Sequence, residues 1–247
     1  MSEPTPSRRR QYVAVLVLVL LSGVAGFFIA RLPVFLNPKI QADAQDVNFE
    51  FVNKWNGVEI LQYPNDLMLY QEIIMEQEPE WIIETGTHAG GQTLYLSAVV
   101  QSIKPDAKIL TVDLDPTRWN RTTKETIKNP NVRAMLDRVE FIEGSSTAPE
   151  VVAKMKQRIG ASKKVLVILD SLHTKEHVVN EMNAYSEMVS PGGYMIVTDT
   201  HLDALWGEVG PKAALDAWLP SHPEFSPDRS RERFVVSANH GGWLRKK

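Results

Sequence analysis

The sequence contains no cysteine. Disulfide bonds, thiolate metal sites and cysteine nucleophiles are therefore excluded, although cysteine-free proteins occur in either redox environment and the compartment stays open. The chain also lacks an excess of positive charge, since its formal net charge is −3. Nucleic-acid binding needs a basic face, so we expect no nucleic-acid partner.

Charge is absent from one long segment near the N-terminus, residues 12–30, which is mostly apolar. A helix of this length rises about 28 Å, close to the hydrocarbon thickness of a bilayer. The segment therefore predicts a single membrane-spanning helix after a basic tail, residues 1–11. A cleaved signal peptide is the competing interpretation, but the apolar run is longer than the usual signal core and no convincing small-x-small site follows it.

The basic residues around this segment bear on its orientation. Three arginines at positions 8–10 precede it, and Arg31 and Lys39 follow it. The positive-inside rule then favours a cytoplasmic N-terminus and an exported remainder of the chain. The cofactor inferred below is made in the cytosol, so the side of the membrane stays open. Residues 31–49 contain prolines and polar residues without periodicity and predict a linker, which leaves residues 50–247 as the main domain.

Short apolar runs alternate with helical patterns from Trp81 onward. Apolar strands that alternate with helices predict a Rossmann-like α/β fold with a mostly parallel central sheet. Helical spacing is clearest over Gly90–Ile103 and Lys175–Val189. The predicted strands are Trp81–Thr85, Lys108–Asp115, Arg138–Gly144, Lys164–Asp170 and Gly193–Thr200.

Acidic residues stand at the carboxyl ends of four of these strands. In parallel sheets ligands bind beyond those ends, so converging acids indicate a site rather than ordinary turn residues. These acids are Glu84, Asp113, Asp115, Asp170 and Asp199.

A glycine-rich turn, Glu84 to Gly91, joins the first predicted strand to its helix. Its glycines, Gly86, Gly90 and Gly91, let the backbone approach a ligand, and the helix start offers free N–H groups to an anion. Thr87 belongs to the same turn, and Glu84 could bind an ammonium group directly or through water. A tight turn without a ligand is the alternative. A dinucleotide-binding loop matches less well, because the Gly-x-Gly-x-x-Gly spacing is absent.

Two further segments predict contacts to a nucleoside. Asp113, at the end of the second strand, can accept both hydroxyls of a ribose, although a turn or capping role is the alternative. Ser145 and Ser146 follow the third strand and could lie against an adenine ring. They could equally cap a helix.

Asp170 and Asp199 end the fourth and fifth strands, which are neighbours in the expected sheet. Two such carboxylates can hold a hard cation such as Mg²⁺, and a cation bound to a substrate hydroxyl lowers the pKa of that hydroxyl. His173 lies close enough in sequence to serve as a general base or as a ligand. His177, one turn further, is expected to be a partly exposed residue on a helix surface.

These motifs together resemble the cephalosporin hydroxylase-like and rhamnosyl O-methyltransferase-like family, over about residues 50–247. Each motif alone is weak, but the ordered set is specific. The segments that carry the resemblance are Trp55-Asn56-Gly57, Tyr63-Pro64-Asn65-Asp66-Leu67, Ile83-Glu84-Thr85-Gly86-Thr87, Val112-Asp113-Leu114-Asp115, Leu169-Asp170-Ser171-Leu172-His173, Asp199-Thr200 and Asn239 to Leu244.

The resemblance implies a class I methyltransferase that uses S-adenosylmethionine and a divalent metal to methylate a hydroxyl of a sugar, glycolipid or secondary metabolite. It implies Asp170 and Asp199 as metal ligands and Asp113 as the ribose ligand. Family members often have Glu-Asp at the fifth strand end, where this chain has Thr198-Asp199. Related catechol-type enzymes place a lysine base where this chain has His173.

Two other classes stay open from the sequence. One is a nucleotide-dependent oxidoreductase on the same fold, which the glycine spacing disfavours. The other is a non-catalytic membrane-anchored protein with a degenerate methyltransferase domain, for which Thr198 is the single supporting feature. A homo-oligomer is compatible with the sequence, which carries no signal for the oligomeric state or for the acceptor.

Overall fold

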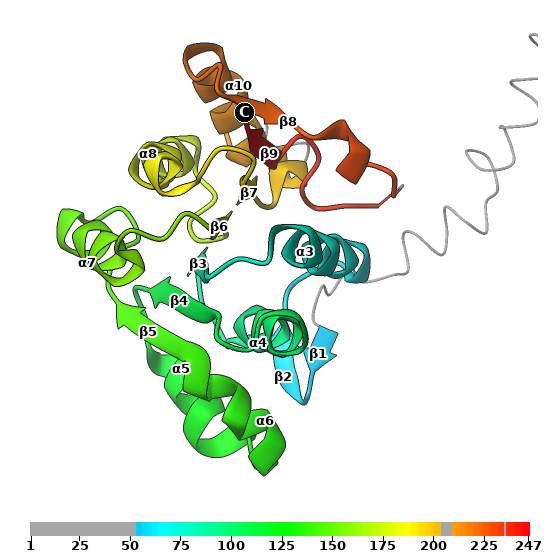
Figure 1. Cartoon of the computed structure of the whole chain (residues 1–247), viewed down its shortest axis with the longest axis vertical. Helices are drawn as coiled ribbons and strands as arrows, with labels where there is room; N and C mark the ends of the chain where they lie inside the picture. The colour runs from blue at the N-terminus through cyan, green and yellow to red at the C-terminus, as the bar shows by residue number, and fades with distance from the viewer. Residues whose placement is uncertain (1–52, 204–208, 235) are drawn as a thin grey trace, which may run out of the picture. The chain divides into compact units, whose positions relative to one another are not determined.

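The computed structural model describes residues 53–203, 209–234 and 236–247, and these belong to one compact unit of the chain (Figure 1). No helix within those ranges has the length and apolar character needed to cross a membrane. The predicted membrane span, residues 12–30, and the predicted linker, residues 31–49, lie outside the described residues. Both therefore remain predictions from the sequence.

A seven-stranded sheet with the strand order β5-β4-β3-β6-β7-β9-β8 forms the centre of the domain. Five neighbouring strands, β5, β4, β3, β6 and β7, pair in parallel. Strand β9 runs antiparallel to both of its neighbours, β7 and β8. The predicted Rossmann-like fold with a mostly parallel sheet is thus confirmed. The strands are β3 (Trp81–Thr85), β4 (Lys108–Asp113), β5 (Val139–Glu143), β6 (Val165–Leu169), β7 (Tyr194–Val197), β8 (Phe225–Pro227) and β9 (Trp243–Lys246).

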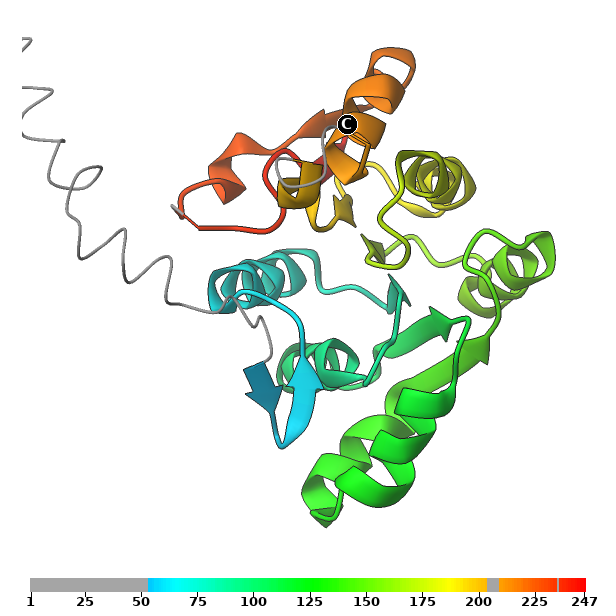
Figure 2. The ribbon, with the colours of Figure 1, turned by 180° about the vertical axis from the view of Figure 1, so that it is seen from behind.

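Helices cover both faces of the sheet. One face carries α3 (Pro64–Gln77) and α4 (Gly91–Ile103), and the other carries α7 (Pro149–Ile159), α8 (Lys175–Tyr185) and α10 (Pro211–Trp218) (Figures 1 and 2). The remaining elements are the hairpin β1 (Asn53–Trp55) and β2 (Val58–Ile60), α5 (Thr117–Arg121), a π-helical turn (Thr122–Thr126), α6 (Pro130–Ala134) and five 3-10 turns (Met135–Arg138, Ser186–Met188, Thr200–Leu202, Leu219–Ser221, Arg229–Arg231).

The near-continuous apolar character of the central strands follows from this two-sided cover. Successive side chains of a strand point to opposite faces. In β3, for example, Ile82 packs with the cluster beneath α3 and α4, and Ile83 packs with the cluster beneath α7, α8 and α10. Both are fully buried. Each central strand therefore needs apolar residues at consecutive positions.

The chain order places a switch point between β3 and β6. The segment after β3 leads outward to β4 and β5, whereas β6 lies on the other side of β3 and leads to β7. Parallel sheets bind ligands in the crevice at such a point, beyond the carboxyl ends of the strands. The candidate site lies there.

Candidate functional site at the carboxyl end of the sheet

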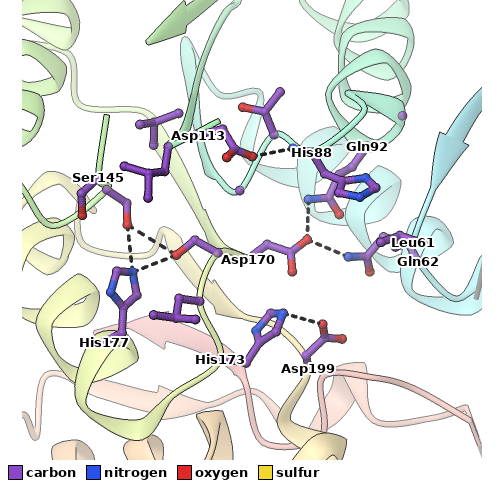
Figure 3. Close-up of a pocket in the computed structure, with 18 of the residues that line it drawn as sticks. Leu61, Gln62, His88, Gln92, Asp113, Ser145, Asp170, His173, His177 and Asp199 are labelled. Atoms are coloured by element: carbon purple, nitrogen blue, oxygen red, sulfur yellow. Dashed lines mark hydrogen bonds and ion pairs between the residues drawn. The ribbon is translucent and has the colours of Figure 1, made fainter. Parts of the chain in front are cut away.

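A cavity of about 480 Å³ opens beyond β3, β4 and β6 (Figure 3). Its volume falls within the range of small-molecule sites. The segment between β2 and α3 closes one side with Leu61 and Gln62. The predicted site residues that line the cavity are Gly86, Thr87, Gly91, Asp113, Ser145, Ser146, Asp170, His173 and Asp199.

The three predicted glycines differ in their surroundings. Gly86 has φ +83°, and a Cβ there would lie 1.9 Å from the carbonyl oxygen of Asp170. A Cβ at Gly91 would lie 2.1 Å from the carbonyl oxygen of Glu59. Gly90 does not line the cavity; it is the N-cap residue that precedes α4, with φ +84°, and the ring of Trp119 occupies the space beside it. Gly90 thus serves packing, whereas Gly86 and Gly91 bring backbone close to the cavity.

Glu84 lies beneath the cavity and does not line it. Its side chain is fully buried, and its Oε2 accepts hydrogen bonds from the hydroxyls of Thr93 (2.5 Å) and Thr111 (2.6 Å). Burial raises the pKa of this carboxyl to about 7, against the lowering effect of those hydrogen bonds. The Oε1 atom of Glu84 is buried and has no hydrogen-bond partner among the described residues. The contact of Glu84 with a ligand ammonium, directly or through water, stays a prediction, because the carboxyl lies behind the cavity wall.

Asp113 is held at the rim of the cavity by backbone groups. Its Oδ2 accepts the N–H of His88 (2.7 Å), and its Oδ1 accepts the N–H of Asp115 (3.0 Å). His88 has φ +51°, a conformation that turns this N–H toward the carboxylate. The next residue, Leu114, is 73% exposed and also lines the cavity. A fixed carboxylate beside an exposed apolar side chain suits a sugar hydroxyl pair next to a planar base.

Asp170 lies at the centre of the cavity wall and is surrounded by donors (Figure 3). Its Oδ2 accepts the side-chain amides of Gln62 (2.9 Å) and Gln92 (3.1 Å). Its Oδ1 accepts the hydroxyl of Thr198 (2.6 Å). Burial, and then the nearby negative charge of Asp199, raise the pKa of Asp170 well above its ordinary value.

Asp199 and His173 face one another. The Nε2 atom of His173 lies 3.2 Å from Oδ2 of Asp199 (Figure 3). Burial raises the pKa of Asp199 above its ordinary value, and the electrostatic effect of His173 acts in the opposite direction and lowers this pKa. Asp199 has φ +55°, which is unusual for a residue other than glycine. The side-chain oxygen of Asn239 accepts its backbone N–H (3.1 Å), so the C-terminal segment holds this conformation.

Ser146 takes part in a network at the far end of the cavity. The Nε2 atom of His177 lies 3.0 Å from the hydroxyls of both Ser146 and Ser171, and Ser171 donates to the buried Glu181 (2.7 Å). His177 is a partly exposed residue of α8, as expected, and its exposed part also lines the cavity. The sequence could not show that α8 turns this side toward Ser146.

Other residues of the cavity were not predicted from the sequence as site residues: Leu61, Gln62, His88, Gln92 and Leu172. The sequence carries no signal for the two glutamines, because an amide before or within a helix is usually exposed. His88 was visible as part of the glycine-rich turn. Its left-handed backbone, which brings its N–H to Asp113, depends on the folded turn.

The residues present fit a divalent cation. One ligand atom each from Asp170, His173 and Asp199 lie within 4.8 Å of one another, and all three side chains are half-buried. Two carboxylates supply the oxygen ligands that hard cations require. Thr198 does not replace a third acid, because its hydroxyl is neutral and has one proton to donate, with Asp170 Oδ1 at 2.6 Å and the carbonyl oxygen of Leu169 at 3.0 Å as the acceptors within reach.

The fold and this cavity define a class I methyltransferase domain. Among solved structures, CmcI with Mg and SAM bound superposes with a TM-score of 0.60 at 17% identity, over 79% of this chain and 76% of CmcI. The O-methyltransferase TomG of Streptomyces achromogenes, in complex with SAM, gives 0.52 at 13% identity, over 66% and 71%. At such identities the similarity concerns the fold.

Sequence comparison gives the family. The family model described as rhamnosyl O-methyltransferase/CmcI matches residues 48–247. The rhamnosyl O-methyltransferase of Mycobacterium tuberculosis (strain H37Rv) is 32% identical over 199 residues, 78% of this chain and 72% of the relative. That of Mycobacterium leprae is 29% identical over 186 residues, 72% and 76%. The chain belongs to the rhamnosyl O-methyltransferase/CmcI family, and the predicted class of S-adenosylmethionine-dependent O-methyltransferase is confirmed.

Proposed function

We propose that the chain transfers the methyl group of S-adenosylmethionine to a hydroxyl of a sugar, glycolipid or secondary metabolite, with help from Mg²⁺ or another divalent cation. The observation that carries this proposal is one cavity lined by two unlike groups of residues. Asp113 and the exposed Leu114 form one group, and the carboxylates Asp170 and Asp199 form the other. The relatives named rhamnosyl O-methyltransferase support a sugar hydroxyl as the acceptor.

The cofactor would lie along the turn that follows β3. Asp113 would accept the ribose hydroxyls, and Ser145 and Ser146 would lie beside the adenine. Gly86 and Thr87 would run under the sulfur and the methionyl part, with Gly91 at the start of α4. The domain's main contribution is then to hold the methyl donor and the acceptor oxygen in line, because orientation can supply much of the rate enhancement.

The cation would be held by Asp170 and Asp199. When bound, it would lower the pKa of the acceptor hydroxyl and so favour the alkoxide as nucleophile. His173 is the imidazole at this point of the cavity, 3.2 Å from Asp199. It would serve either as the base that takes the hydroxyl proton or as a further ligand, because one nitrogen lone pair cannot do both.

The alternatives are less well supported. The family match and the absence of the dinucleotide spacing disfavour an oxidoreductase. A degenerate, non-catalytic domain would need a lost site, yet Asp113, Asp170, His173 and Asp199 all line the cavity. Anchoring by residues 12–30, which would bring the domain to a lipid-linked acceptor, is part of the proposal and rests on the apolar sequence.

Asp170→Asn tests the proposal on the full-length protein. We expect methyl transfer to fall by at least about 100-fold, since a residue that acts on the reacting hydroxyl is removed. Affinity for S-adenosylmethionine, measured by isothermal titration, should change little. Asp216→Asn, an exposed acid of α10 that pairs with Lys212, is the matched control. Unchanged turnover in Asp170→Asn would remove its catalytic role, and absent cofactor binding in the folded wild type would overturn the function itself.

A further inference from the structure

Two side chains of α8, His177 and Glu181, hold the hydroxyls of two cavity residues (Figure 3). The Nε2 atom of His177 lies 3.0 Å from the hydroxyl oxygens of both Ser146 and Ser171. The Ser171 hydroxyl donates to Oε1 of Glu181 at 2.7 Å, and this oxygen lies 3.6 Å from Nε2 of His177. Glu181 is 1% exposed and does not line the cavity. The four side chains thus form one network that connects a buried acid to the cavity.

The acceptors of this network determine where its protons lie. A serine hydroxyl has one proton to donate. The buried carboxylate of Glu181 needs a donor, and the Ser171 hydroxyl supplies it. Ser171 therefore has no proton left for His177. It follows that Nε2 of His177 carries a proton and donates toward the two hydroxyl oxygens, whether the imidazole is neutral or charged.

The hydroxyl proton of Ser146 is then left without a partner in the network. It cannot be donated to the protonated Nε2 of His177, and the Ser171 oxygen lies 3.4 Å away, beyond the usual range for an O–H···O hydrogen bond. Ser146 is 5% exposed, and the Tyr185 hydroxyl donates to its carbonyl oxygen at 2.7 Å. The backbone at Ser146 is thus held in place, and a nearly buried donor beside the cavity lacks a good acceptor among the described residues.

We propose that Ser146 donates this proton to a ring nitrogen of the cofactor's adenine, and that His177 and Glu181 are positioning residues that fix the direction of the donor. The inference rests on the proposed function, which puts S-adenosylmethionine in this cavity. Two exposed leucines, Leu114 and Leu172, line the same cavity and suit the apolar faces of a planar base.

A donor with a fixed direction makes the site selective. Adenine presents the ring nitrogens N1, N3 and N7 as acceptors. Replacement of the nitrogen that faces Ser146 by C–H would leave the donor unpaired, and a site built around a hydrogen bond rejects a ligand that lacks the matching group. Without His177, the Ser146 hydroxyl would be free to turn, and this selectivity would weaken.

The test is isothermal titration of the full-length protein with S-adenosylhomocysteine and with its 1-deaza, 3-deaza and 7-deaza analogues. We expect one analogue to bind at least about 10-fold more weakly than S-adenosylhomocysteine, the scale of one unpaired buried donor. In Ser146→Ala this deficit should shrink to about twofold. Ser102→Ala, at an exposed serine of α4 that bonds its own helix, should keep the full deficit. No deficit for any analogue, or one that is unchanged in Ser146→Ala, would overturn the proposal.

Two measurements address the positioning role of His177. In His177→Ala the same deficit should shrink while S-adenosylhomocysteine still binds. His177→Gln, whose amide can donate to the same hydroxyls, should restore part of it. The ¹⁵N shifts of the imidazole in the wild-type protein should show a proton on Nε2, and this readout does not depend on the folding of a variant. An unprotonated Nε2, or a full deficit in His177→Ala, would overturn the positioning role.

The same titrations separate this inference from the proposed function. Wild-type protein that binds S-adenosylhomocysteine and all three analogues equally would overturn the role of Ser146 and leave the methyltransferase assignment standing. Folded wild-type protein that binds neither S-adenosylhomocysteine nor S-adenosylmethionine would count against the assignment itself.

Discussion

At the scale of single residues, the site depends on a contact between backbones. Gly86 follows β3 and Asp170 follows β6, and these strands pair in parallel. The space beside the Gly86 Cα is filled by the Asp170 carbonyl, so a side chain at residue 86 would push Asp170 out of place. The glycine-rich turn therefore leaves the space that the chain needs at the end of the neighbouring strand, β6.

Gly86→Ala should consequently remove binding of both the cofactor and the cation. The control is Gly192→Ala, because Gly192 has nearly the same φ (+80° against +83°) and nothing within 4 Å of an added Cβ. An alanine at either position costs about 1 kcal/mol in backbone strain. Only the alanine at residue 86 also places its Cβ against the Asp170 carbonyl. Isothermal titration and thermal unfolding measure the two effects. Equal losses in both variants would show that the approach to Asp170 is unimportant.

Glu84 makes the stability of the domain depend on pH. Its pKa in the folded protein is about 7, above the ordinary value of 4.5, so the folded state holds a proton that the unfolded state has released. The stabilisation from this proton is complete below pH 4.5 and is lost as the pH rises through 7.

In Glu84→Gln this contribution is removed. The free energy of unfolding of the wild type, relative to the variant, should fall by about 2–3 kcal/mol between pH 5 and pH 8, since each pKa unit corresponds to about 1.4 kcal/mol. Urea unfolding of both proteins at the two pH values measures the difference. A difference that grows with pH would show that the carboxyl is ionised in the fold.

At the scale of elements, α3 connects the C-terminal segment to the site. Asp66, in the first turn of α3, is fully buried and accepts the hydroxyl of Ser237 and the N–H of Ala238, both at 2.7 Å. The side-chain oxygen of the next residue, Asn239, accepts a hydrogen bond from the backbone N–H of Asp199. Two of the motifs that carry the family resemblance thus meet, and together they fix the conformation of Asp199.

Asp66→Ala should leave the Ser237 and Ala238 donors without partners. We expect a loss of about 2–4 kcal/mol in unfolding free energy, because each unsatisfied buried group costs about 1–3 kcal/mol. We also expect weaker cation binding with little change in cofactor affinity, since the hydrogen bonds lead from Asp66 through residues 237–239 to Asp199 and not to Asp113 or Gly86. Calorimetry and paired titrations measure these, with the exposed Met68→Ala on the same helix as control. Equal weakening of both ligands would contradict a specific role toward Asp199.

The elements differ in how far the sequence predicts them. The five parallel strands were predicted within three residues at either end, because burial on both faces leaves long apolar runs. β8, β9 and the β1–β2 hairpin were not predicted, since they have three or four residues each. β9 pairs with β7 across 46 or more residues, so its strand character depends on tertiary contacts. The acids at strand ends were predictable because they stand where these apolar runs end. Gln62 and Gln92, by contrast, reach Asp170 only in the folded domain.

At the scale of the whole molecule, the cavity and its walls are supplied by one unit of the chain. The predicted cofactor and metal residues all lie within Phe51–Lys247, which has its own buried core. The family match covers the same part, residues 48–247. The apolar segment 12–30 precedes this unit, so the sequence predicts that membrane attachment and catalysis belong to separate parts of the chain.

Deletion of residues 1–49 should therefore move the protein from the membrane pellet to the supernatant without a change in affinity for S-adenosylmethionine. A charge-free apolar segment of this length favours the bilayer strongly, whereas the described domain contains no helix that could span it. Cell fractionation followed by isothermal titration measures both properties. Full-length protein in the supernatant with its N-terminus intact would show that residues 12–30 do not anchor the chain, and N-terminal sequencing would identify cleavage. Truncated protein that stays in the pellet would show instead that the domain itself binds the membrane.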